Sequence, residues 1–222
     1  GGMSWESSLE YYRLINEFTK EKLGNKHSAE CLMYSVDFAE IEEMQHKGQW
    51  ELLKNEMIEY AQNLKKGGAE MIVICTNTMH KMADDIEEKL DIPLLHIADA
   101  AAKSINEKKM AKVGLLGTKF TMERNFYKNR LKEHDIDVII PWEEEREIVH
   151  NTIYNELIDG VILDESREKF QNIIQNLYAR GAEGVVLGCT EIPLLIKEKD
   201  SPIPVFATTE LHAKEAVEFA LK

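Results

Sequence analysis

Two stretches of the chain repeat one pattern of residues that could carry out proton transfer. They read GAEMIVICTNT, residues 68–78, and GAEGVVLGCTE, residues 181–191. When the shared Gly-Ala-Glu is superimposed, the ninth position is Thr76 in the first copy and Cys189 in the second. A thiol can give up or, once ionised, accept a proton, whereas a hydroxyl is poor at removing one at neutral pH. The repeat therefore predicts an unequal acid and base on two matched elements.

The second copy places its thiol where a strand gives way to a loop. Residues 184–188 form an apolar run ahead of Cys189, and Pro193 is typical of a helix start. Backbone N–H groups and the helix dipole at such a place favour anions, so we expect a lowered pKa for Cys189. An isolated buried Cys is more often an inert core residue. The strand-end position and the repeat favour a functional role.

The other two cysteines are expected to be bystanders. Neighbouring side chains of an extended strand point to opposite faces. If Thr76 faces the site as Cys189 does, Cys75 faces the core between sheet and helices. Cys31 lies in neither copy of the repeat.

Strands and helices alternate along the whole chain, which predicts parallel sheets covered by helices. Strands are expected at residues 31–36, 71–75, 92–97, 112–117, 136–141, 184–188 and 203–206, with helices between them. The second half repeats the first, so the predicted fold class is α/β, with two pseudo-symmetric parallel-sheet lobes wrapped by helices. Ligands sit beyond the carboxyl ends of such strands, which predicts an active-site cleft between the lobes.

The repeat also sets the expected domain limits. The first lobe should comprise residues 1–97 and 207–222, and the second residues 98–206. GLLGTKFT, residues 114–121, follows a strand, whereas no strand precedes GGMSW, residues 1–5. We therefore expect the first strand of the first lobe to lie upstream of this sequence.

Composition excludes several classes of function. A net charge of −13 over 222 residues argues against nucleic acid or an anionic membrane as partner, because both need a basic patch. No apolar run approaches the roughly 20 residues of a membrane span. Three cysteines without C-x-x-C spacing make no disulfide framework, so a cytoplasmic protein is expected. Nucleotide-binding and metal-binding motifs are absent, and we predict no metal site.

Three motifs resemble the aspartate/glutamate racemase family over essentially the whole chain. They are CTNTMHK at residues 75–81, GCTEI at 188–192 and GGMSWES at 1–7. The resemblance implies exchange of the α-proton of an acidic amino acid, without pyridoxal phosphate or metal, by the residues at the positions of Thr76 and Cys189. Most members have Cys at both positions. In having Thr76, this sequence resembles the branch specific for L-aspartate and L-glutamate. The resemblance also implies a homodimer.

Removing an α-proton leaves a carbanion whose charge spreads onto the carboxylate, which calls for fixed hydrogen-bond donors. The expected donors are Asn77, Thr78, Thr118, Thr121, Thr190 and Glu191, and the resemblance implies Met3 and Gln45 as further substrate-binding residues. Gln45 is expected in the acidic loop that follows residues 31–36. Some of these residues have ordinary alternatives: Thr121 could cap a helix, Met3 could fill a core, and Gln45 could be a surface residue. His80 could polarise Thr76 or lie on a helix face, and we expect His96 to bond a backbone carbonyl.

Two other functions remain open at this point. Relatives with similar paired motifs isomerise or decarboxylate other carboxylic acids, and a protein that lost a thiol at Thr76 could bind an acidic amino acid without turning it over. The preferred function is cofactor-independent racemisation of aspartate or glutamate, with the L form as the favoured starting enantiomer by resemblance.

Overall fold

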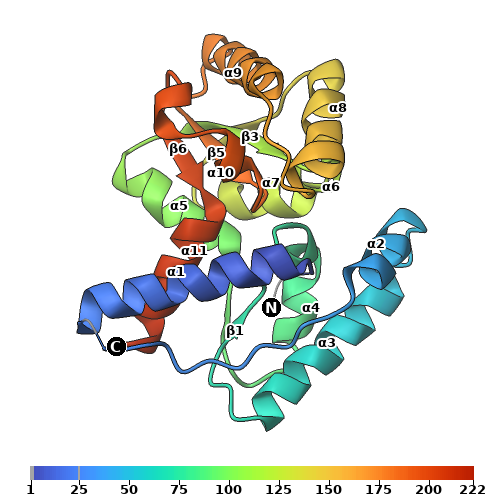
Figure 1. The fold of residues 1–222 in the computed structure, drawn as a ribbon, viewed down its shortest axis with the longest axis vertical. Coiled ribbons are helices and arrows are strands. Elements are labelled where there is room, and N and C mark those ends of the chain that lie inside the picture. The colour runs from blue at the N-terminus through green and yellow to red at the C-terminus, as the bar shows by residue number, and fades with distance from the viewer. Residues whose placement is uncertain (1–2, 25) are drawn as a thin grey trace. The chain divides into compact units, whose positions relative to one another are not determined.

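The computed structural model describes residues 3–24 and 26–222 (Figure 1). The glycine turn expected at Gly1 and Gly2 lies outside the described residues. The chain forms two compact units: unit 1 is Gly1–His96 with His212–Lys222, and unit 2 is Ile97–Leu211.

Unit 2 is built on a four-stranded sheet in which every pair of strands is parallel. Its strands are β3 (Lys112–Gly117), β4 (Asp137–Ile139), β5 (Gly184–Gly188) and β6 (Val205–Ala207), in the spatial order β4-β3-β5-β6. The two central strands are buried almost throughout, as expected of a parallel sheet covered on both faces.

Helices cover both faces of this sheet because the strand side chains alternate. Leu116, Val185 and Leu187 pack in one apolar cluster with residues of the later helices, and Leu115 and Val186 pack in another with residues of the earlier ones. The later helices are α8 (Glu143–Thr152), η2 (Ile153–Leu157), α9 (Asp164–Ala179) and α10 (Ile192–Leu195); the earlier ones are α5 (Ile97–Glu107) and α7 (Asn125–Lys132).

Unit 1 has a much smaller sheet. Strands β1 (Ile72–Val73) and β2 (Leu94–Leu95) pair in parallel. The helices of this unit are α1 (Trp5–Leu23), α2 (Phe38–His46), α3 (Trp50–Lys66), η1 (Thr78–Met82) and α4 (Ala83–Glu87). Helix α11 (Thr208–Ala220) belongs to it from His212 onward.

The segment around β1 has core on both faces. Ile72 and Ile74 pack in a cluster with residues of α3 and α4, whereas Cys75 packs in a second cluster with Tyr11 of α1 and Ala213 of α11. Cys75 is buried, as the alternation of side chains predicts. Cys31 is exposed.

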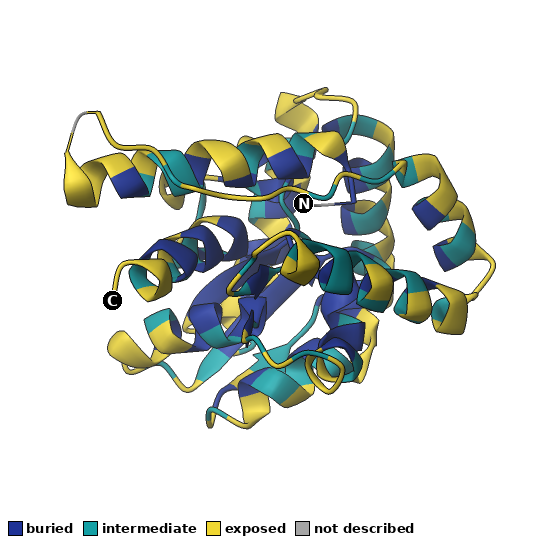
Figure 2. Cartoon of the chain, turned by 90° about the horizontal axis from the view of Figure 1, so that it is seen from below, coloured by how far each residue is buried: buried dark blue, intermediate teal, exposed yellow. Residues whose placement is uncertain are grey.

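Most helices show one buried and one exposed side in Figure 2, while the central strands are dark blue along their length. This division is typical of amphipathic helices on a sheet core. None of the helices among the described residues is long and apolar enough to cross a membrane.

The α/β class, with parallel sheets flanked by helices, is confirmed, and β3 and β5 have the predicted bounds. The strand predicted at residues 31–36 is wrong, because this segment runs as loop with Leu32 and Met33 about half exposed, at 53% and 48%. No described strand pairs with it, and a strand needs a backbone partner. The single helix expected between the strands at 112–117 and 136–141 is interrupted at Arg124, whose backbone is extended between α6 (Lys119–Glu123) and α7.

Gln45 was expected in an acidic loop, and this is also wrong. The acidic stretch forms helix α2, because the Asp37 side chain accepts a hydrogen bond from the Ala39 N–H at 3.0 Å and so caps its first turn. Gln45 lies in the last turn of this helix and is buried.

Candidate functional site

The sheet of unit 2 presents Cys189 directly beyond its two central strands. Gly117 of β3 pairs with Gly188 of β5 at the last step of their ladder, and the partly buried Cys189 follows at once. A Cβ on Gly117 would come within 2.9 Å of the Gly188 carbonyl oxygen. Glycine therefore allows the two strand ends to lie this close, and their approach sets the backbone position of Cys189.

Cys189 has a carboxylate as its immediate partner. Its Sγ donates a hydrogen bond to Glu191 Oε2 at 2.9 Å, and Glu191 is buried. Burial, followed by the charge of Glu191 and this hydrogen bond, raises the pKa of the Cys189 thiol well above its ordinary value. The lowered pKa expected from the helix start is therefore wrong. Helix α10 is only four residues long, and the backbone N–H groups that favour the thiolate are outweighed.

Three threonines of unit 2, Thr118, Thr121 and Thr190, lie near this strand end. Thr118 caps helix α6 by accepting a hydrogen bond from the Thr121 N–H, so the helix-capping role considered for Thr121 belongs to Thr118. Thr121 is fully buried, and its methyl group lies against the space where Gly117 and Gly188 lack a Cβ. Thr190 is partly exposed beside Cys189.

In unit 1, Thr76 occupies the corresponding place. It lies in a bend three residues after β1 ends and is partly exposed, whereas Asn77 and Thr78, which follow it, are buried at the start of η1. The structure thus brings Thr76, Asn77 and Thr78 together in unit 1. It brings Cys189, Thr190, Glu191, Thr118 and Thr121 together in unit 2.

A buried histidine cluster lies behind Thr76. His80 Nδ1 lies 2.7 Å from the Thr76 carbonyl oxygen, so His80 bonds the backbone of Thr76. The His80 ring meets the rings of His96 and His212 edge-on, at centroid distances of 4.6 Å and 5.6 Å. Burial, helped by both neighbouring histidines, lowers the pKa of His80 well below its ordinary value, which keeps the ring neutral.

Sequence reasoning missed His212 of this cluster and its partner Tyr11. The Tyr11 hydroxyl lies 2.8 Å from His212 Nδ1, and His212 Nε2 lies 2.8 Å from the Leu95 carbonyl oxygen. A carbonyl can only accept, so His212 Nε2 carries the hydrogen and Tyr11 donates to Nδ1. The two residues are 201 positions apart, and no local pattern connects them.

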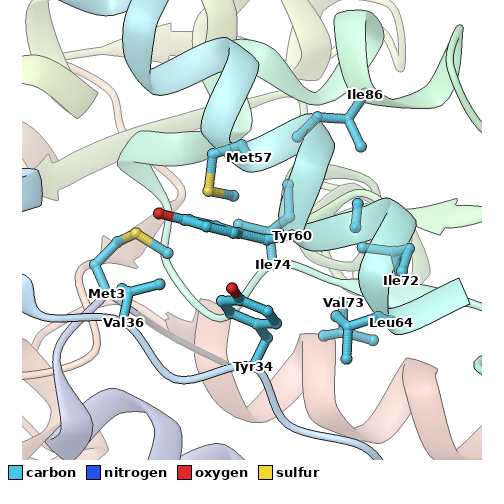
Figure 3. A pocket seen from close by; sticks show the side chains of 11 residues that line it. Met3, Tyr34, Val36, Met57, Tyr60, Leu64, Ile72, Val73, Ile74 and Ile86 are labelled. Carbon is cyan, nitrogen blue, oxygen red and sulfur yellow. The ribbon is translucent and has the colours of Figure 1, made fainter. Parts of the chain in front are cut away.

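Two other expected site residues lie in the core of unit 1. Met3 is buried and lines an apolar hollow together with Tyr34, Tyr60 and aliphatic side chains (Figure 3). Every side chain that lines this hollow is uncharged, which does not suit the charged groups of an amino acid. Gln45 Nε2 lies 3.3 Å from Met79 Sδ.

The sequence profile of the Asp/Glu/Hydantoin racemase family matches residues 1–216. The chain belongs to this family. Within the family, it is similar to a Yersinia pestis protein of known structure provisionally named an Asp/Glu racemase, with 50% identity, 100% of this chain and 97% of that chain covered, and a TM-score of 0.94. A Pyrococcus horikoshii aspartate racemase homologue is 36% identical over 100% of this chain and 97% of its own, with a TM-score of 0.88.

An amino-acid racemase of Bacillus subtilis is less similar in sequence. The broad-specificity amino-acid racemase of Bacillus subtilis is 26% identical over 170 residues, which is 74% of this chain and 71% of that protein. Family membership confirms the resemblance of the three motifs and connects this fold to amino-acid racemases.

Metal ligands are not grouped in this racemase-family chain. Within residues 3–24 and 26–222, no set of three or more His, Cys, Asp or Glu side chains is placed to hold a metal ion. The three buried histidines instead contact one another and the backbone.

Proposed function

We propose that this protein racemises acidic amino acids, aspartate or glutamate, without a cofactor, by proton transfer through Cys189 and Thr76. The observation that carries the proposal is the thiol–carboxylate pair of Cys189 and Glu191 at the end of β5. In the sequence repeat, Thr76 beyond β1 occupies the position equivalent to Cys189. The protein would bind an amino acid as its small-molecule substrate and, by family resemblance, a second copy of the chain.

The pair gives Cys189 a route to become a base. At rest the thiol keeps its proton, because burial and the Glu191 charge raise its pKa. In turnover, Glu191 accepts that proton and leaves a thiolate, and the thiolate then takes the α-proton of the substrate. The C–H bond breaks, its electron pair stays on the α-carbon, and a new S–H bond forms.

Thr76 completes the reaction from the other side of the α-carbon. Its O–H bond breaks as a proton passes to the carbanion, and the resulting alkoxide is neutralised by a proton from water. Glu191 returns its own proton to water, so no net charge or proton is gained. Asn77, Thr78, Thr118 and Thr190 are proposed to donate hydrogen bonds to the substrate carboxylate as its charge grows.

The proposal is tested by following the α-proton in D₂O. Each enantiomer of aspartate and glutamate is incubated with the protein, and loss of the α-proton NMR signal is measured beside optical rotation. Exchange with racemisation is expected for at least one pair. Binding of an acidic amino acid without any exchange would replace racemisation by a binding function, and exchange only with other carboxylic acids would point to a different isomerase.

A further inference from the structure

Thr76 lies where the sheet of unit 1 no longer holds the backbone. Strand β1 ends at Val73, so the backbone from Ile74 to Asn77 leaves the ladder before η1 begins at Thr78. Cys189 differs, because it follows a five-residue strand that pairs with neighbours on both sides. The backbone around Thr76 therefore needs another source of support if its hydroxyl is to have a fixed direction.

Ser7 holds the peptide plane before Thr76. Its hydroxyl donates a hydrogen bond to the carbonyl of Cys75, which belongs to the peptide group that joins Cys75 to Thr76. Ser7 is buried in the first turn of α1, and its own N–H is bonded to the Ser4 hydroxyl at 3.2 Å. One turn further along, Tyr11 attaches the same helix to His212.

His80 holds the peptide plane after Thr76. A carbonyl oxygen can only accept, so across this contact of 2.7 Å His80 donates through Nδ1 to the Thr76 carbonyl. The ring is 2% exposed and lies against His96 and His212, which restrict its rotation.

A residue has only two soft backbone dihedrals, and these are set once the peptide planes on both sides of its Cα are fixed. We propose that Ser7 and His80 are positioning residues that fix both planes around Thr76 and so aim its side chain at the substrate. This inference rests on the proposed function, but it concerns how Thr76 is aimed and not whether it reacts. The two side chains replace the ladder bonds that the short strand β1 does not supply.

The test separates proton delivery by Thr76 from proton removal by Cys189. When the L substrate is incubated in D₂O, the Cys189 thiol can place deuterium on the face from which it removed the proton, which gives labelled L substrate. Thr76 can instead deliver deuterium to the opposite face, which gives the D form. The ratio of labelled L to newly formed D therefore reports on Thr76 alone. For Ser7→Ala and His80→Leu, we expect kcat for racemisation to fall about tenfold or more with KM changed by less than about twofold. The ratio of labelled L to D should rise.

Conservative variants provide the matched comparison. Ser7→Thr keeps the hydroxyl, and His80→Asn places an amide N–H near the position of Nδ1, so both should recover most of the lost racemisation. Thr19→Ala removes another buried hydroxyl of α1, one that bonds the Ile15 carbonyl of its own helix, and should leave the ratio unchanged. A ratio that stays constant while labelling and racemisation fall together would overturn the positioning role.

A second readout does not depend on turnover. A carbonyl ¹³C resonance moves upfield when its hydrogen-bond donor is removed, so the Thr76 carbonyl should shift in His80→Leu and stay near its place in His80→Asn. If the unaltered protein labels none of the four amino acids, the proposed function fails, and this resonance still decides whether His80 holds Thr76. An unmoved resonance in His80→Leu overturns the inference.

Discussion

The Cys189 thiol donates a hydrogen bond to the Glu191 carboxylate, two residues further along the chain, over 2.9 Å. The negative charge in the free protein therefore lies on Glu191 and not on sulfur. The reactivity of the Cys189 thiol should therefore depend on this one neighbour.

Glu191→Gln should lower the pKa of Cys189, because the change removes the negative charge that opposes a thiolate. The measurement is the pH dependence of iodoacetamide alkylation of Cys189, with Cys31 and Cys75 replaced by Ala. Glu165→Gln makes the same charge change on an exposed turn of α9 and should leave the profile in place. A profile that moves to higher pH in Glu191→Gln would contradict the role of the carboxylate.

Replacing the two cysteines of the repeated motifs should affect exchange differently. Cys189→Ala should abolish α-proton exchange, since no other thiol follows β5. Cys75→Ala should leave exchange nearly intact while costing about 1–2 kcal/mol of stability, because it opens space in the cluster of Tyr11, Leu14 and Ala213. Exchange assays and urea unfolding of both variants measure these effects, and loss of exchange in Cys75→Ala would disprove the assignment.

The handedness of the reaction follows from the hydroxyl at position 76. The reverse direction asks the Thr76 hydroxyl to act as a base, so the initial rate with saturating L substrate should clearly exceed that with D. Thr76→Cys should raise the D rate about tenfold or more and narrow the gap. The equilibrium between mirror images stays even, so only initial rates test this. Equal rates in the unaltered protein would remove Thr76 as the second proton-transfer residue.

Acid should destabilise unit 1 through His80. Its pKa in the folded chain lies well below the ordinary value of 6.5, so between these two values the unfolded chain binds a proton that the folded chain does not. The free energy of unfolding therefore falls as pH drops through 6.5. Urea unfolding from about pH 7.5 to about pH 5 should show a shallower decline in His80→Asn than in the unaltered protein. Replacement of the exposed His27 by Asn should not change the slope.

Gly117→Ala should displace the strand end that carries Cys189. The added Cβ would lie 2.9 Å from the Gly188 carbonyl oxygen, and backbone cannot give way as a flexible side chain can. We expect a loss of about 1–3 kcal/mol in stability and a larger proportional loss of activity than of folded protein. Thermal unfolding with kinetics at matched folded fraction measures both, and full activity in this variant would show that the close strand approach does not position the thiol.

The sequence predicted the elements whose signal is local. Strand β5 is a short apolar run bounded by turn residues, and its bounds agree with the structure. The segment at 31–36 carries the same local signal but has no partner strand among the described residues, and pairing is not visible in a single stretch. Gln45 was misplaced because an acidic run reads as loop until Asp37 is recognised as its cap.

The site was predictable only as far as the repeat reaches. The comparison of the two copies singled out Thr76, Cys189 and Cys75 as candidates because it aligns positions directly, without knowledge of the fold. It could not give the direction of the Cys189 pKa, which depends on how close Glu191 comes and how deeply the pair is buried. Nor could it find Ser7 as a support for Thr76, since that bond joins residues 68 positions apart.

The division of the chain between the two units has a consequence for biosynthesis. Unit 2 is one continuous stretch, Ile97–Leu211, whereas unit 1 needs both Gly1–His96 and His212–Lys222. His212 and Ala213, which pack with Tyr11 and Cys75, are synthesised after the whole of unit 2. On the ribosome, the half that is synthesised first must therefore wait, and the half synthesised second is the first able to complete its core. During that interval Tyr11 and Cys75 lack the cover that His212 and Ala213 give them in the folded chain.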